Sequence, residues 1–224
     1  WAEEQDLSVS LSSVSSQPPL APNPYLMDSA GTKAEEMAAN NYFYHISQVT
    51  GLYPNELADD CGYTLNSIFS LEANNIETIA AGYSGGLDAL TALIVDDYST
   101  SKVDRALLLS TSSGYQKYRE IGVGYGYSSS STYTYYWAAH AAYTNSTDTF
   151  LTGVVYKDTD GDGEFDAGEG LGSVVIMPDQ GTYYATTCST GGYSLPLTTS
   201  GTLNLTLSGG ELSGRIKKSV TTNT

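Results

Sequence analysis

Six carboxylates are crowded into residues 158–169, whose sequence is DTDGDGEFDAGE. Asp158, Asp160 and Asp162 alternate along the chain, so their side chains converge where the backbone coils, and Gly163 permits a sharp turn there. Ca²⁺ takes six to eight oxygen ligands in a flexible cage. The spacing therefore predicts a Ca²⁺ loop, with Glu164 contributing its backbone carbonyl. The predicted ligands are Asp158, Asp160, Asp162, Glu164, Asp166 and Glu169.

The alternative interpretation of residues 158–169 is an acidic turn that water alone solvates. Six carboxylates at this density repel one another strongly unless a cation lies among them. The pattern also matches an EF-hand loop at positions 1, 3, 5, 9 and 12, with glycine at position 6. We therefore favour the Ca²⁺ loop over the solvated turn.

The loop must be positioned by strands, because helical periodicity is lost after Thr149. Short apolar runs alternate with turn residues, and Leu203, Leu205 and Leu207 alternate with polar residues as in a half-buried strand. This texture predicts a small all-β sandwich over residues 149–224. The expected strands cover residues 152–156, 172–177, 182–187, 193–197 and 202–208.

The C-terminal segment resembles a known class of Ca²⁺-binding domain. Gly153-Val154-Val155-Tyr156 precedes the acidic loop, and Gly170-Leu171-Gly172-Ser173-Val174-Val175-Ile176 follows it. Together with the run from Thr186 to Leu195, these segments are similar to the B-type repeats of bacterial surface adhesins and to the carboxypeptidase regulatory-like sandwich. The resemblance implies a spacer that Ca²⁺ makes rigid, without chemistry of its own.

The first 148 residues have a mixed pattern. Residues 1–24 are expected to form an arm or a short helix, where Leu7, Val9, Leu11 and Val14 mix strand and helix periods. The next segment, 25–41, is predicted to be an amphipathic helix with Lys33, Glu35 and Glu36 on its outer face. We predict a loop over 46–63, further helices over 65–71, 87–98 and 103–109, a strand or turn over 77–81, and strands over 119–127 and 133–143 joined by a hairpin loop at 128–131.

Residues 25–143 resemble the bacterial branch of the CAP superfamily, also described as SCP-like, a superfamily that includes cysteine-rich secretory, antigen five and pathogenesis-related proteins. The residues that carry the resemblance are Tyr42-Phe43-Tyr44-His45-Ile46-Ser47, Glu77-Thr78-Ile79-Ala80-Ala81-Gly82, Val103-Asp104-Arg105-Ala106-Leu107-Leu108, Glu120-Ile121-Gly122-Val123-Gly124-Tyr125 and Tyr136-Trp137. The resemblance implies a three-layer α-β-α sandwich with a central cleft. The fold class expected for the whole chain is therefore α+β, with the CAP-like domain at 25–148.

The cleft of that family gathers two histidines and two acids, and the histidine pair can hold a metal. His45 and Glu77 match one residue of each kind, while Asp104 stands where the second histidine is expected and Ser101 where the other acid is expected. We therefore expect a remnant of the CAP cleft at His45, Glu77 and Asp104, and Zn²⁺ is not expected there. A structural hydrogen bond between His45 and Glu77 is the alternative to a ligand site. The second histidine of the chain, His140, reaches the cleft only if its strand points it there.

The bulk composition restricts the partners. The chain has 224 residues and a net charge of −16, which argues against nucleic acid and anionic membranes as partners. No apolar run approaches the length of a membrane span. Cys61 and Cys188 are equally consistent with one bridge and with two free thiols. Because the sequence opens at Trp1, we expect a mature product from which an export signal has been removed.

These features favour a secreted, non-catalytic structural or binding protein at the cell surface or outside the cell. Its Ca²⁺-rigidified sandwich would act as a spacer. The 19 tyrosines and 23 glycines also allow a subunit that self-associates into a surface layer or filament. Two alternatives use the CAP-like cleft: a metal-dependent hydrolase, and a carrier of lipid or another small ligand.

Overall fold

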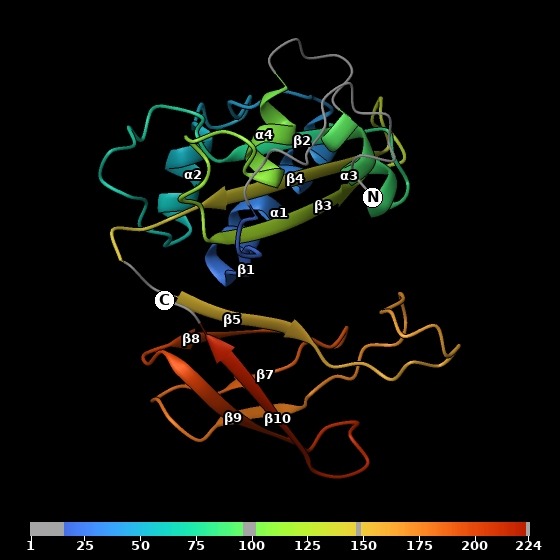
Figure 1. Ribbon diagram of the computed structural model, residues 1–224. Coiled ribbons are helices and arrows are strands. Elements are labelled where there is room, and N and C mark those ends of the chain that lie inside the picture. The colour runs from blue at the N-terminus through green and yellow to red at the C-terminus, as the bar shows by residue number, and fades with distance from the viewer. Residues whose placement is uncertain (1–15, 96–101, 147–148, 223–224) are drawn as a thin grey trace. The chain divides into compact units, whose positions relative to one another are not determined.

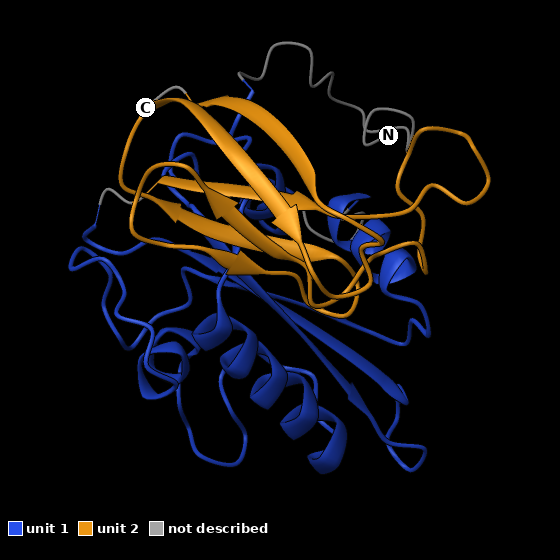
Figure 2. Cartoon of the chain, turned by 90° about the horizontal axis from the view of Figure 1, so that it is seen from below, with its two compact units in different colours: residues 1–146 blue, residues 147–224 orange. Residues whose placement is uncertain are grey.

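The computed structural model describes residues 16–95, 102–146 and 149–222. The chain divides into two compact units, Trp1–Ser146 and Thr147–Thr224, shown in blue and orange in Figure 2. Unit 1 mixes helices and strands, whereas the described part of unit 2 holds strands only. The chain as a whole is therefore α+β, as predicted. The predicted arm falls mostly on residues 1–15, outside the described residues.

Unit 1 is built on a four-stranded sheet in the order β1-β3-β4-β2 (Figure 1). The long hairpin of β3 (Glu120–Tyr127) and β4 (Tyr135–Ala142) forms its centre, with β2 (Glu77–Ala81) antiparallel to β4. The short β1 (Ala21–Pro22) pairs in parallel with the start of β3. Helix α1 (Pro24–Asn40) covers one face of this sheet, and α3 (Gly86–Val95) and α4 (Val103–Leu109) cover the other. These are the three layers that the resemblance implied.

Helix α1 (Pro24–Asn40) approaches β3 unusually closely. Its buried face follows helical spacing, Asn23 accepts from the first backbone amides, and Asn41 ends the helix in the left-handed conformation at φ 53°. On the side of β3 that faces α1, three successive positions are glycines, Gly122, Gly124 and Gly126. No side chain therefore lies between the strand and the helix at these positions. A Cβ on Gly122, Gly124 or Gly126 would lie 2.0, 2.1 or 2.1 Å from backbone atoms of Leu26, Ala30 or Ala34, respectively.

Two of the predicted elements in unit 1 are wrong. Residues 46–63 contain the helix α2 (Pro54–Asp60), which the glycines and proline around it obscured. Pro54 occupies its first turn, where proline is tolerated because the amide there has no helical partner. The predicted helix at 65–71 is a series of turns and bends instead. Helices α3 (Gly86–Val95) and α4 (Val103–Leu109) lie where the pattern placed them, and residues 96–98 of the first are outside the described residues.

Unit 2 contains two sheets around one apolar core. The first has the order β10-β9-β6-β7, and the second pairs β5 with β8. Val174, Ile176, Leu195 and Leu203 are each at most 1% exposed in the core that both sheets share. The strands are β5 (Thr149–Val154), β6 (Val175–Pro178), β7 (Ala185–Thr186), β8 (Gly192–Leu197), β9 (Gly201–Ser208) and β10 (Ile216–Thr222).

The last strand of unit 2 escaped the sequence analysis. β10 has the sequence IKKSVTT and carries two lysines, so its composition resembles a polar tail. It pairs along its whole length with β9, and this pairing defines it as a strand. The strand predicted at 152–156 begins earlier, at Thr149, and the one predicted at 182–187 is reduced to two residues.

Both cysteine thiols are free, Cys61 in unit 1 and Cys188 in unit 2. Burial raises the pKa of the Cys61 thiol. A hydrogen bond with the Thr190 hydroxyl lowers the pKa of the Cys188 thiol. Among the described residues, no helix has both the length and the apolar character needed to cross a membrane.

The glycine face of β3 gives a testable prediction. Replacing Gly124 by Ala places a Cβ 2.1 Å from the Ala30 carbonyl oxygen, so α1 must move away from the sheet. We expect a loss of about 3 kcal/mol or more in the free energy of unfolding, measured by urea denaturation.

Gly31→Ala is the matched control, since Gly31 lies within α1 and its added Cβ meets no atom within 4 Å. We expect this variant to gain about 0.5–1 kcal/mol. Equal effects of the two substitutions would contradict the close packing of α1 on β3.

Candidate functional site

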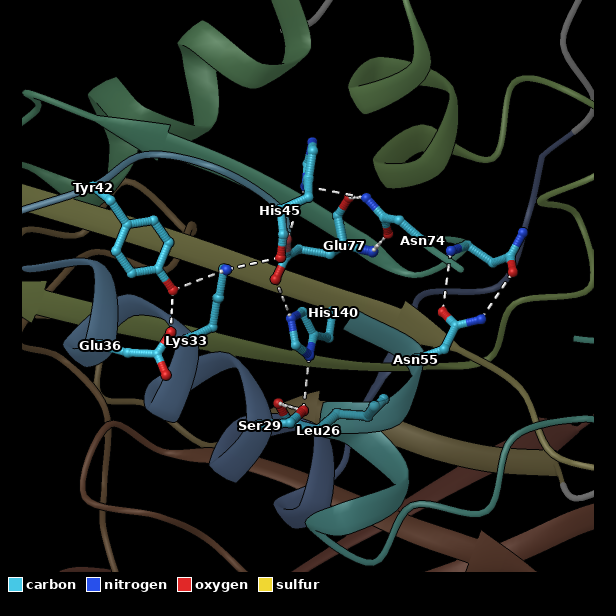
Figure 3. Close-up of polar contacts among 11 residues, drawn as sticks. Leu26, Ser29, Lys33, Glu36, Tyr42, His45, Asn55, Asn74, Glu77 and His140 are labelled. Atoms are coloured by element: carbon cyan, nitrogen blue, oxygen red, sulfur yellow. Dashed lines mark hydrogen bonds and ion pairs between the residues drawn. The ribbon is translucent and has the colours of Figure 1, made fainter. Parts of the chain in front are cut away.

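Glu77 lies at the centre of a buried polar network between α1 and the sheet of unit 1 (Figure 3). It stands on β2 directly opposite His140 on β4, and both side chains are 0% exposed. The His140 Nε2 lies 2.9 Å from one Glu77 carboxylate oxygen. The His45 Nδ1, from the loop after α1, lies 2.8 Å from the other. The sheet register and the loop thus bring both histidines of the chain to one carboxylate.

Ser29 extends the network into helix α1. Its hydroxyl oxygen lies 2.8 Å from His140 Nδ1 and 3.1 Å from the Leu26 carbonyl oxygen. A carboxylate at Glu77 requires a proton on His140 Nε2, since a carboxylate accepts only. The Ser29 hydroxyl donates to the Leu26 carbonyl oxygen and lies within hydrogen-bond distance of Nδ1, so both ring nitrogens of His140 have partners inside the core. A ligand role is therefore closed to His140.

His45 is held in the opposite way, with one ring nitrogen inside and one outside. Its Nδ1 donates to Glu77, and the side chain is 42% exposed. The Asn74 amide is 3.1 Å from the same nitrogen, but it donates instead to the Glu77 backbone carbonyl oxygen at 3.2 Å. This arrangement fixes the tautomer that leaves Nε2 with a lone pair, the form that binds metals or accepts protons.

The network keeps Glu77 ionised despite its burial. Burial by itself raises the pKa of this carboxyl group, but the hydrogen bonds from His140 and His45 outweigh it, and the pKa is lowered. The charge of Lys33 acts in the same direction. Glu77 is therefore a carboxylate with its oxygens occupied by two imidazole donors.

The assignment of Lys33 to the outer face of its helix is wrong. Its side chain is buried, at 1% exposed, on the face of α1 that packs on the sheet. The ammonium donates to the His45 carbonyl oxygen at 2.7 Å and to the Tyr42 hydroxyl at 3.2 Å. Burial lowers the pKa of Lys33, while Glu77 and Glu36 oppose that shift. The buried ammonium ties the His45 loop to the helix.

Glu36 belongs to the same network: its side chain is half-buried and bonded to the loop after α1. It accepts from the Tyr42 hydroxyl and, at 3.0 Å, from the Ser47 hydroxyl. Burial and the neighbouring Glu36 carboxylate raise the pKa of Tyr42. The Ser47 oxygen in turn accepts from the Val49 and Thr50 amides. The motif from Tyr42 to Ser47 is therefore a folded loop whose polar groups satisfy one another.

The structure joins His45 with Glu77, as predicted, and adds three residues that the sequence analysis did not assign to this site: Ser29, Lys33 and Asn74.

Asp104 lies in the first turn of α4. Burial, and then the negative charge of Asp104, raise the pKa of Tyr115. The neighbour of Asp104, Arg105, is buried and donates to the carbonyls of Ile94 and Val95 at the end of α3, where a helix favours a cation. The predicted strand alternation, with Ala138, His140 and Ala142 on one face, was the available signal for His140.

The acidic loop of unit 2 brings three of its predicted ligands together. Asp158, Asp160 and Asp162 each offer an oxygen, and these oxygens lie within 4.8 Å of one another. Asp158 also accepts from the amides of Gly161 and Gly163, which coil the loop at φ 84° and 86°. Such oxygens, on a flexible loop, are the donors that Ca²⁺ takes.

The other predicted ligands, Glu164, Asp166 and Glu169, lie on the same loop but outside this group of three. The Glu169 carboxylate accepts from the Thr159 amide at 2.6 Å and the Asp166 amide at 3.1 Å, and the Thr159 bond is the main cause of its lowered pKa. The negative charge of Asp162, followed by burial and the other acids of the loop, raises the pKa of Asp166. The backbone amide of Glu164 donates a hydrogen bond to an Asp162 carboxylate oxygen at 2.8 Å. The loop therefore concentrates negative charge that a cation would neutralise.

The comparisons with known proteins give little. No family model and no curated protein matches the sequence. The fold is similar to that of an extracellular protein containing an SCP domain from Bacillus anthracis str. Ames, at 23% identity and a TM-score of 0.40. The match covers 57% of this chain and 35% of that chain, about a third of its length. A similarity at this TM-score carries no functional argument, so function is inferred from the residues of the two sites.

The Glu77 network predicts how stability depends on pH. Because the folded pKa of Glu77 is lowered, its contribution is present above the ordinary glutamate pKa of about 4.3 and is lost as the pH falls through the folded value. Glu77→Gln should cost about 3 kcal/mol at pH 7 and flatten this acid limb, measured by denaturant unfolding from pH 7 to pH 3.

Glu35→Gln is the matched control, because Glu35 is exposed on the outer side of α1. It should change the free energy of unfolding by less than about 0.5 kcal/mol. A Glu77→Gln protein with the same acid limb as the wild type would show that Glu77 does not contribute to it.

Proposed function

We propose that the chain is a secreted, non-catalytic extracellular protein in which Ca²⁺ stiffens unit 2 as a structural spacer and unit 1 acts as a CAP-like head. The observation that carries the proposal is the convergence of Asp158, Asp160 and Asp162 on one point of an acidic loop. Unit 2 takes the role of the adhesin B-type repeats that its sequence resembles.

The anchoring of the loop supports a mechanical role for the ion. At the loop's base, Tyr156 and Gly170 form an isolated bridge, and the Lys157 amide donates to the Glu169 carbonyl oxygen at 3.0 Å. The Tyr156 ring packs edge-on against Phe165 at 5.7 Å. A cation held by the three aspartates would fix the connection between β5 and β6. Charge neutralisation is all the chemistry it would supply.

The geometry of unit 1 supports a head without catalysis. Ser29, His140 and Glu77 have the residue types of a hydrolytic triad, but each has its side chain inside the core, at 0–3% exposed. A nucleophile must reach its substrate. Ser29 also lies on the α1 face that packs against the sheet, so no substrate carbonyl can approach it. The network stabilises the fold instead.

A metal-dependent hydrolase is the second candidate, because His45 points a lone pair outward. A catalytic zinc site uses three protein ligands. The nitrogens of His140 are both occupied, and the acidic loop is the one candidate metal cluster in the described part of the chain. The observations therefore favour a structural role for His45.

Carriage of a lipid or small ligand is the third candidate, and the size of the apolar groove beneath α3 does not favour it. An apolar groove lies between α3 and the sheet, lined by Leu90, Leu93, Leu108, Val123 and Trp137. Its volume is about 80 Å³. Ligand pockets usually measure about 300–1,000 Å³. The groove is too small to enclose a lipid chain.

Calcium binding gives the central prediction. Ca²⁺ should raise the unfolding temperature of the intact protein, because an ion that binds only the folded loop stabilises it by about 2.7 kcal/mol at 100 times its dissociation constant. Asp158→Asn and Asp160→Asn should each reduce this shift strongly, measured by differential scanning calorimetry with Ca²⁺ and with chelator.

Asp28→Asn on the exposed side of α1 is the control for charge alone, and it should keep the full Ca²⁺ shift. Thermal unfolding of the wild type that is identical in chelator and in millimolar Ca²⁺ would rule out the proposal.

Binding of Zn²⁺ distinguishes the metal-dependent hydrolase from the structural proposal. With the acidic loop saturated by Ca²⁺, addition of Zn²⁺ should give no unfolding shift that depends on His45, measured by comparing the wild type with His45→Ala. A Zn²⁺ shift in the wild type that is lost in His45→Ala would support the metal-dependent hydrolase instead.

A further inference from the structure

The two sheets of unit 2 differ in width, and the difference leaves part of the core uncovered. A four-stranded sheet ending in β10 shares one core with the two-stranded sheet of β5 and β8. Ile216, Lys218 and Val220 of β10 stand opposite the core residues Leu207, Leu205 and Leu203 of β9. Ile216 is nevertheless 43% exposed, whereas these leucines are 1–8% exposed. The smaller sheet is one strand too narrow to cover β10.

The uncovered region is a groove of about 470 Å³. Leu205 and Leu207 lie along it, with Tyr193 on the β8 side and Ile216 and Val220 on the β10 side. Its lining is mostly apolar, with Asp158 and Lys218 as its charged residues, and its shape is that of a gap between sheets rather than a closed pocket. An apolar gap of this kind fits a strand that adds its own apolar side chains to the core.

The two strand edges beside the groove differ in charge. β5 has the sequence TFLTGV, without a charged residue or proline, and among the described residues it pairs with β8 alone. β10 carries Lys217 and Lys218, the kind of residue that protects an edge from pairing. An incoming strand would therefore pair with β5 and lay its apolar face over β10.

We propose that this groove receives residues 7–12 of a second copy of the same chain. In that segment Leu7, Val9 and Leu11 alternate with Ser8, Ser10 and Ser12. Period-two alternation puts the three apolar side chains on one face of a strand and the serines on the other. The segment thus supplies what the groove lacks, one amphipathic strand.

Charge complementarity supports the same occupant. Glu3, Glu4 and Asp6 directly precede the alternating segment. Three of the nine basic residues of the chain lie between positions 215 and 218, and Lys218 lines the groove. In a chain with a net charge of −16, this is an unusual concentration of positive charge. The acidic residues of the incoming segment would pair with it and fix its direction.

Insertion of one chain's segment into the next chain's groove is a head-to-tail contact. Such contacts are heterologous, so they extend into open fibres or close into rings. The inference deepens the proposed structural role and rests on it, since it names the partner of the spacer as another copy of the chain.

The test uses full-length variants that each damage one side of the contact. Val9→Asp damages the segment and leaves the groove intact, whereas Ile216→Asp damages the groove and leaves the segment intact. By multi-angle light scattering, the wild type should form assemblies that grow with concentration, and each variant alone should be monomeric, with self-affinity reduced about 100-fold or more. An equimolar mixture of the two should form dimers and nothing larger, because only one productive contact remains.

Matched controls place the same charge on the opposite faces. Ser10→Asp falls on the serine face of the segment, and Thr221→Asp lies on the outer face of β10, so both should assemble like the wild type. Lys218→Glu should weaken assembly about tenfold or more, and combined replacement of Glu3, Glu4 and Asp6 by Lys should restore it.

A wild type that stays monomeric at all concentrations, through insertion into its own groove or an unrelated occupant, overturns the inference. So does a mixture of Val9→Asp and Ile216→Asp that remains monomeric. The Ca²⁺ shift in unfolding temperature, measured on the same variants, shows separately whether unit 2 is folded and whether the calcium proposal holds.

Discussion

The direct contact between α1 and the glycine face of β3 is the constraint on which unit 1 depends. Without side chains at Gly122, Gly124 and Gly126, the helix backbone rests on the strand itself. At that distance the residues of α1 that face the sheet, Ser29 and Lys33 among them, are forced into the interior. Buried polar groups are costly unless they are satisfied. The close packing therefore requires a polar network beneath the helix.

Glu77 meets that requirement by accepting hydrogen bonds from two imidazoles, while Lys33 supplies a nearby positive charge. Residue types that could perform hydrolysis are used here to satisfy one another. Chemical reactivity depends on access as much as on residue type, and only His45 of this group reaches solvent. This arrangement supports the proposal of a head without catalysis.

Unit 2 shows the opposite design, with its carboxylate cluster at the surface and its core incompletely covered. The acidic loop holds unneutralised charge at Asp158, Asp160 and Asp162, and the mismatch in sheet width exposes Ile216. Each feature lacks a complement that the described part of the chain does not provide. A cation would complete the first and an added strand the second, so the two proposals share one logic.

The sequence alone was enough for features that depend on local spacing. The glycines and aspartates of the loop, the amphipathic helix ended by Asn41, and the β2 and hairpin strands all follow from residues close together in the chain. Tertiary structure decided what depends on distant partners: α2, the strand character of the lysine-bearing β10, the burial of Lys33 and the pairing of His140 with Glu77. The physical reason is that the sequence alone does not determine whether a polar side chain faces the core or the solvent. Which side it takes is set by the partner that satisfies its charge or hydrogen bonds, and for His140 that partner lies 63 residues away.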